Sequence, residues 1–134
     1  MSFDLQLIKD YQKIAFVKLL GIKILEISDE EAIASMKVKK NMGNYMESLH
    51  GGVIASLIDT IAFFPGKLLP SGRKITTTSL EVKYIRPVSV GEKLTAKAKI
   101  LHLGKKIGII EVSVTNSFEK LVAKGMVSVI NITE

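Results

Sequence analysis

A single carboxylate interrupts an otherwise apolar stretch near the middle of the chain. Residues 51–64 are small or apolar except for two hydroxyl residues and Asp59. A short segment that is apolar almost all round a helical wheel is typical of a helix buried in a core. On that wheel the residues that precede Asp59 on its own face are small: Gly52, Ala55 and Ser56. A buried acid beside open space predicts a substrate site.

The same stretch begins with the pair Gly51-Gly52, which follows His50. Glycine has no side chain that could bond the first N–H groups of a helix, and those groups carry the positive end of the helix dipole. We therefore expect this end of the helix to bind developing negative charge.

Length and composition fit one compact domain, residues 1–134. The 134 residues are 47% hydrophobic and 24% charged, which is enough apolar material for a sizeable core. A formal net charge of +6 favours an anionic partner. The basic residues are scattered in pairs without interleaved aromatic residues, so we do not expect nucleic-acid binding.

Residue types exclude several kinds of site. The chain has no cysteine and only two histidines, His50 and His102, so a disulfide, a catalytic thiolate and a zinc site are not expected. We expect no metal and no redox cofactor. Charged residues near the start of the chain argue against a signal peptide, and no apolar run is long enough to cross a membrane. We therefore expect a cytoplasmic protein without a membrane partner.

The segments around the central stretch predict an α+β fold. Helical spacing predicts one amphipathic helix over residues 2–20, with Ser2 as N-cap and Gly21 as stop. A loop over residues 40–49 leads into the central helix, Pro65-Gly66 ends it, and a second loop surrounds Pro70-Ser71-Gly72. Six strands are expected, over residues 22–26, 32–38, 75–86, 94–103, 107–114 and 121–132.

The long strands need an apolar element to cover. Alternation in residues 75–86 places Leu80, Val82 and Tyr84 on one face of the strand. The helix after His50 is the obvious element to pack against such faces. The predicted order is a helix, two strands, the buried helix and four strands.

This order and the chemistry of the helix resemble the hotdog fold, in which a curved antiparallel sheet wraps one central helix and two chains pair side by side. Within that superfamily the chain is most similar to the phenylacetate-degradation type (PaaI-like) acyl-CoA thioesterases, over nearly its whole length. The landmarks are Asn44, His50-Gly51-Gly52, Asp59, and Tyr84-Ile85-Arg86-Pro87 followed by Gly91.

The resemblance implies hydrolysis of an acyl-CoA thioester to a carboxylic acid and free coenzyme A, with no cofactor beyond the coenzyme A of the substrate. Asp59 matches the family's carboxylate, which acts as general base on water or as nucleophile. Gly51 matches the position whose backbone N–H polarises the thioester carbonyl, with help from Asn44. Thr77 falls where a Ser or Thr holds the water or the acid, although a strand bulge would shift that match. The residues expected to contact substrate are His50, Gly52, Phe63 and Arg86.

Spacing adds a prediction that does not depend on the resemblance. Gly51 and Asp59 are eight positions apart, roughly 12 Å along a helix, which is too far for both to meet one carbonyl. If both act on the same thioester, they come from different copies of the chain. A two-fold homodimer would carry two equivalent sites, and dimers could pair again into a tetramer.

Each site residue also has a structural interpretation. Asp59 could accept backbone N–H bonds, the glycines could allow close packing, and Asn44 could be a turn residue. Phe63 and Phe64 could fill the core or line an acyl pocket. Arg86, with Lys83, Lys105 and Lys106, could meet the phosphates of coenzyme A or simply be solvated.

Two other functions are compatible with the same fold. The first is a non-catalytic module that binds acyl-CoA or fatty acids. The second is a lyase that acts on an enoyl thioester, but that chemistry usually pairs the acid with a helix-borne histidine, and no His follows Asp59 in the helix.

Overall fold

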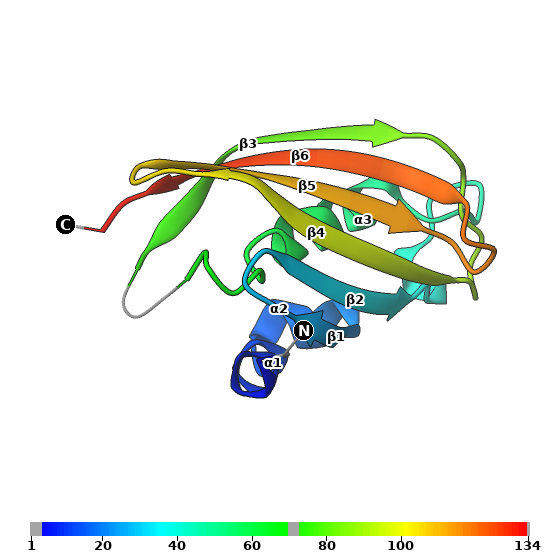
Figure 1. Cartoon of the computed structure of the whole chain (residues 1–134). Helices are drawn as coiled ribbons and strands as arrows, with labels where there is room; N and C mark the ends of the chain where they lie inside the picture. Colours follow the sequence, from blue (N-terminus) through cyan, green and yellow to red (C-terminus); the bar gives the residue numbers. More distant parts are fainter. Residues whose placement is uncertain (1–3, 70–72, 134) are drawn as a thin grey trace.

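A computed structural model describes residues 4–69 and 73–133 of the chain. One six-stranded antiparallel sheet runs in the order β1-β2-β4-β5-β6-β3 (Figure 1). The strands are β1 (Ile22–Ile27), β2 (Glu31–Lys37), β3 (Ile75–Tyr84), β4 (Lys93–Leu103), β5 (Ile107–Thr115) and β6 (Leu121–Asn131). All six predicted strands are confirmed, with ends within two residues of the expected bounds. The predicted loop around Pro70-Ser71-Gly72 lies outside the described residues.

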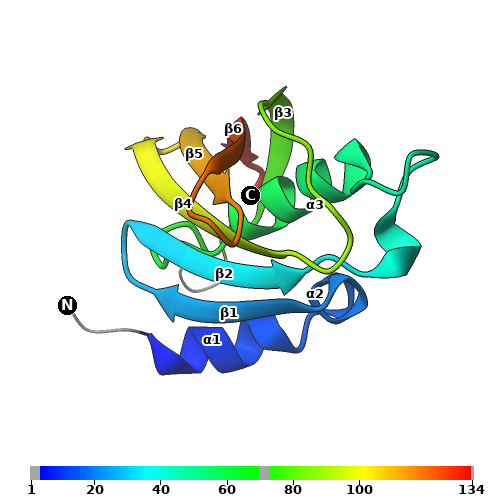
Figure 2. The same ribbon diagram turned by 90° about the vertical axis from the view of Figure 1, so that its right-hand side faces the viewer.

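The central helix α3 (Gly51–Ile61) lies in the hollow of the curved sheet (Figures 1 and 2). One of its faces is buried, through Ile54, Leu57, Ile58 and Ile61. The opposite face, which includes Asp59, is only partly buried. The prediction of a helix buried all round is therefore wrong for the single chain, because the sheet wraps only one side of it.

Small residues on the inner face of the sheet let α3 approach closely. Five buried alanines line this face: Ala32, Ala34, Ala96, Ala98 and Ala123. At Gly125 of β6 an added Cβ would lie 2.5 Å from the Cγ2 of Ile58 on the helix. A side chain at Gly125 would therefore overpack the contact between the sheet and the helix.

The N-terminal segment forms two helices, α1 (Leu5–Gln12) and α2 (Ala15–Leu20), so the prediction of one helix is wrong. Ile14 between them is extended, with ψ 131°, and this residue changes the direction of the chain. The change lets Tyr11 stack on Phe64, with ring centroids 4.9 Å apart, while α2 buries residues of its own against β1. Burial, with Asp4 and Asp10 nearby, raises the pKa of Tyr11. Asp4 caps α1, and the predicted cap Ser2 lies outside the described residues.

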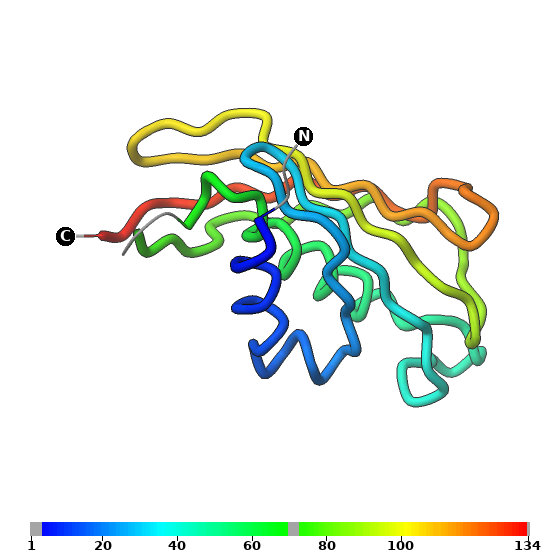
Figure 3. The backbone as a smooth tube through the Cα atoms, turned by 60° about the horizontal axis from the view of Figure 1, so that its bottom comes forward, coloured from blue at the N-terminus to red at the C-terminus, as the bar shows by residue number. Residues whose placement is uncertain are grey.

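The two edges of the sheet differ in how they are covered. At β1 the side chain of Gln12 donates to the Ile22 carbonyl at 2.6 Å and accepts from the Ile24 N–H at 3.0 Å. Helix α1 lies beside this strand (Figure 3). Within the described residues no side chain bonds the outer edge of β3 in this way. The free edge of the sheet is therefore β3.

The remaining helix is one 3-10 turn, η1 (Lys40–Met42), inside the predicted loop before α3. No helix in the described part of the chain is long and apolar enough to span a membrane.

Candidate active site

Asp59 lies on the partly buried face of α3 and has a partner on β3. The hydroxyl of Thr77 donates to Asp59 Oδ1 at 2.8 Å. A carboxylate with one oxygen held by a hydroxyl keeps its second oxygen for another donor, such as a water molecule. The structure therefore brings together Asp59, the residue predicted as general base or nucleophile, and Thr77, the residue predicted to hold it.

A β-bulge brings Thr77 to this position. The register between β3 and β6 shifts between Thr77 and Ser79, so that Thr77 pairs with Val129 and Ser79 pairs with Ser128. Without the extra residue Thr77 would share the outer face with Ser79, because strand side chains alternate. With the bulge it joins the inner face and meets the helix.

The start of α3 offers fewer free N–H groups than predicted. Nδ1 of His50 accepts the Gly52 N–H at 2.9 Å, so His50 is the N-cap. The expectation that the first N–H groups stay uncovered is wrong for Gly52, because the residue before the glycines supplies the acceptor. An accepting Nδ1 carries no proton, which leaves Nε2 as the donor of the ring. The N–H of Gly51 has no hydrogen-bond partner among the described residues.

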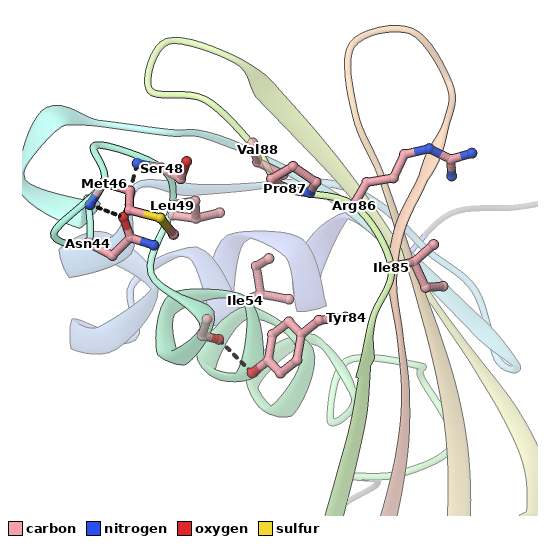
Figure 4. Close-up of a pocket in the computed structure, with 11 residues that line it drawn as sticks. Asn44, Met46, Ser48, Leu49, Ile54, Tyr84, Ile85, Arg86, Pro87 and Val88 are labelled. Carbon is pink, nitrogen blue, oxygen red and sulfur yellow. Dashed lines mark hydrogen bonds between the residues drawn. The ribbon is translucent and has the colours of Figure 1, made fainter.

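Asn44 fills one of the two roles that the sequence left open, that of a turn residue, and keeps its amide nitrogen for the other. Its Oδ1 accepts from the N–H groups of Met46 and Ser48, at 2.8 and 3.1 Å, which orders the loop before α3. This is the arrangement of an Asx turn. The amide nitrogen is not used by those bonds and remains a donor (Figure 4). A turn role and a carbonyl-polarising role are therefore compatible.

A cavity of about 330 Å³ joins the loop to the helix start (Figure 4). It is lined by Asn44 and Gly51 from one side and by Tyr84 and Arg86 from the end of β3. Asp59 does not line it. The two donors predicted to polarise a carbonyl thus share one cavity, and the predicted base lies elsewhere on the same chain.

Arg86 is anchored by a backbone oxygen. Its guanidinium donates to the Leu121 carbonyl at 2.6 Å and points away from Asn44 (Figure 4). The other guanidinium N–H groups remain available to an anion at the rim of the cavity. The prediction that Arg86 meets substrate stays a prediction.

The two phenylalanines after α3 have different surroundings. Phe64 is buried and stacks on Tyr11, so it fills the core. Phe63 is only partly buried. It lies two residues beyond the end of α3 and four positions after Asp59. Of the two, Phe63 is the one that could contact an acyl group.

The spacing of Gly51 and Asp59 is that of one continuous helix. Both residues lie in α3, so eight residues at 1.5 Å per residue separate them by roughly 12 Å. A single chain does not bring the unpaired Gly51 N–H and the Asp59 carboxylate to one carbonyl group.

The family model that describes the thioesterase superfamily matches residues 46–123, which is more than half of the chain and includes Gly51, Asp59 and Thr77. The chain belongs to the thioesterase superfamily. It is 33% identical to acyl-coenzyme A thioesterase PaaI of Escherichia coli over 113 residues, which are 84% of this chain and 79% of that protein. It is 30% identical to acyl-coenzyme A thioesterase 13 of Mus musculus over 105 residues, 78% of this chain and 75% of the relative.

Solved structures of thioesterase superfamily members agree with the fold. The structure of PaaI, from the phenylacetic acid degradation operon of E. coli, superposes with a TM-score of 0.84 at 31% identity, over 92% of this chain and 88% of that one. Thioesterase HI1161 of Haemophilus influenzae superposes with a TM-score of 0.86 at 26% identity, over 99% and 93%. The predicted hotdog fold, PaaI-like family and thioesterase enzyme class are confirmed.

Sequence analysis placed Tyr84 on one face of its strand and used it as a landmark of the family, but assigned it no role in the site. In the structure its hydroxyl donates to the Gly51 carbonyl at 2.8 Å (Figure 4). The signal was its place directly before Ile85-Arg86-Pro87, at the strand end that the thioesterase resemblance already singled out.

Proposed function

We propose that this protein hydrolyses an acyl-CoA thioester to a carboxylic acid and free coenzyme A. The observation that carries the proposal is the pair of half-sites on α3. One half is Asp59 held by Thr77, and the other is the unpaired Gly51 N–H, which shares a cavity with the Asn44 amide. Membership of the thioesterase superfamily gives both halves a common reaction.

In the proposed mechanism Asp59 takes a proton from water while the oxygen attacks the thioester carbonyl carbon. Water is a poor nucleophile until a base receives its proton. Negative charge then develops on the carbonyl oxygen, where the N–H of Gly51 and the amide of Asn44 donate hydrogen bonds. Collapse of the tetrahedral intermediate breaks the carbon–sulfur bond, and the departing sulfur takes the proton from Asp59, so that coenzyme A leaves as the free thiol and the carboxylate is restored. Thr77 keeps the carboxylate turned toward the water.

The roughly 12 Å between Gly51 and Asp59 requires two copies of the chain for one such site. Gly51 and Asn44 of one copy would face Asp59 and Thr77 of the other. The edge strand β3 carries Thr77 and is the edge that no side chain covers within the described residues. An uncovered edge strand is the natural place for another chain to pair. A homodimer formed there would contain two equivalent sites.

The decisive experiment follows thiol release from a panel of coenzyme A esters, such as benzoyl-, octanoyl- and palmitoyl-CoA. The Asp59→Asn variant keeps the shape of the side chain and an oxygen that can accept from Thr77, but it removes the base. We expect turnover to fall at least ~10²-fold with the thermal unfolding curve unchanged.

The experiment also separates the enzyme from a binding module. Saturable binding of these esters to the wild-type protein without release of free thiol would support the non-catalytic alternative. Full turnover by Asp59→Asn would contradict the mechanism assigned to Asp59.

A further inference from the structure

Tyr84 reaches from the end of β3 to the first residue of α3. Its hydroxyl donates to the Gly51 carbonyl at 2.8 Å. Its ring carbons lie 3.3 Å from the position that a Cβ on Gly51 would occupy. The side chain is 55% exposed, so burial in the core does not explain its place. In Figure 4 it stands beside the helix start, on the wall of the cavity that Asn44 also lines.

With the bond from Tyr84, hydrogen bonds hold three of the four polar groups in two successive peptides. The Gly51 carbonyl belongs to the same peptide as the Gly52 N–H, which is bonded to Nδ1 of His50 at 2.9 Å. Both polar ends of this peptide are therefore held by side chains. The preceding peptide is held at the His50 carbonyl, which accepts the Val53 N–H at 3.0 Å. Its other end is the Gly51 N–H, which has no partner among the described residues.

Fixation matters at this position because the residue between the two peptides is glycine. Glycine has more conformational freedom than any other residue, so an unrestrained Gly51 would let its N–H point in several directions. A donor stabilises an oxyanion well only when it is already aimed at the place where charge develops. The hydroxyl of Tyr84 and the ring of His50 restrict that freedom from opposite ends of one peptide.

We propose that Tyr84 is a positioning residue that locks the Gly51-Gly52 peptide and thereby aims the Gly51 N–H at the thioester carbonyl. The inference rests on the proposed thioesterase function. Tyr84 acts through Gly51 and needs no contact with the reacting atoms.

The test is the Tyr84→Phe variant, which removes the hydroxyl and keeps the ring. The variant loses one neutral hydrogen bond, to the Gly51 carbonyl, and with it the alignment of the N–H that stabilises the transition state. This predicts a fall in kcat of about three- to tenfold. We expect KM to change less than twofold, because the misaimed N–H weakens transition-state binding more than substrate binding. Tyr11→Phe is the matched control, since that ring stacks on Phe64 and lies outside the cavity. It should leave kcat unchanged.

A second readout does not depend on turnover. In the ¹⁵N–¹H spectrum of the Tyr84→Phe protein, the Gly52 amide signal should move, because the carbonyl of its peptide has lost a hydrogen bond. Glycines remote from the site, such as Gly91 in the turn before β4, should keep their signals.

The outcomes distinguish the inference from the function on which it rests. An active wild type together with unchanged kcat in Tyr84→Phe overturns the positioning role and leaves the thioesterase proposal standing. An unmoved Gly52 signal overturns it as well. A wild type that releases no thiol from any ester defeats the proposed function and this inference with it.

Discussion

At the scale of single residues, the proposed role of Asp59 as a base depends on the hydrogen bond from Thr77 that holds its carboxylate. Thr77→Val keeps the shape of the side chain but removes the hydroxyl that donates to Asp59 Oδ1. Hydrogen bonds to a charged group are stronger than neutral ones, so we expect kcat to fall about tenfold or more. Steady-state kinetics measure the change.

The neighbouring threonine supplies the control. The hydroxyl of Thr78 donates to the Ser128 carbonyl and does not contact Asp59. Thr78→Val should therefore retain nearly full kcat. Equal losses in the two variants would mean that turnover requires an intact strand and not the hydrogen bond from Thr77 to Asp59.

Gly51 allows its N–H to be tested apart from its size. Proline has no N–H, and it is a favoured residue at the first position of a helix. His50, which precedes it, has ψ 132°, the extended conformation that a residue before proline adopts. We expect Gly51→Pro to lower kcat about 10²-fold or more, because an oxyanion donor is lost.

Gly51→Ala is the matched variant for steric effects. Both side chains carry a Cβ that meets the Tyr84 ring at 3.3 Å, but alanine keeps the N–H. The activity gap between the two variants, after circular dichroism confirms the fold of each, measures the contribution of the donor. Equal activity of the two variants would show that the Gly51 N–H does not act as an oxyanion donor.

At the scale of elements, the packing of α3 on the sheet depends on one glycine in β6, Gly125. A Cβ at Gly125 would lie 2.5 Å from Ile58 Cγ2, so Gly125→Ala forces the helix or the strand to shift. Overpacking of this kind costs about 1–3 kcal/mol in the free energy of unfolding, which urea denaturation would measure.

A double-variant cycle identifies the cause of that loss. Ile58→Ala alone creates a cavity and destabilises the protein. Combined with Gly125→Ala, it frees the space that the new methyl group needs, so the double variant should lose less stability than the two single losses added together. Simple additivity would show that Ile58 does not limit the space at Gly125.

At the scale of the whole molecule, the separation of Gly51 and Asp59 along α3 predicts complementation between inactive chains. In a heterodimer of Asp59→Asn with Gly51→Pro, one site contains both intact residues and the other contains neither. Random pairing makes half of the dimers mixed, so refolding the two variants together should restore about a quarter of wild-type turnover.

The matched mixture combines Asp59→Asn with Thr77→Val. Both changes lie in the same half-site, so this mixture should regain no activity beyond that of its separate components. Failure of the first mixture to exceed its components, with heterodimers verified by mass spectrometry, would place the whole site within one chain.

The sequence by itself determined the six strands and the central helix, and it singled out Asp59. Strand alternation and turn residues predicted six strands, because side chains on a half-buried strand follow a period of two. An apolar segment with one carboxylate predicted a central helix and Asp59. The resemblance to thioesterases added Asn44 and Thr77 and gave Gly51 a role. In the structure Thr77 contacts Asp59, and Asn44 and Gly51 line one cavity.

Only the tertiary structure decided how those residues are held. Thr77 faces Asp59 because a bulge reverses the alternation of β3, and a bulge depends on the pairing with β6 rather than on local sequence. The bond from Tyr84 to the Gly51 carbonyl joins a helix start to a strand end 33 positions later. The N-terminal helix is interrupted at Ile14 because Tyr11 of α1 packs on Phe64 while α2 packs against β1. In each case the decisive partner is distant in sequence, and local patterns carry no information about distant contacts.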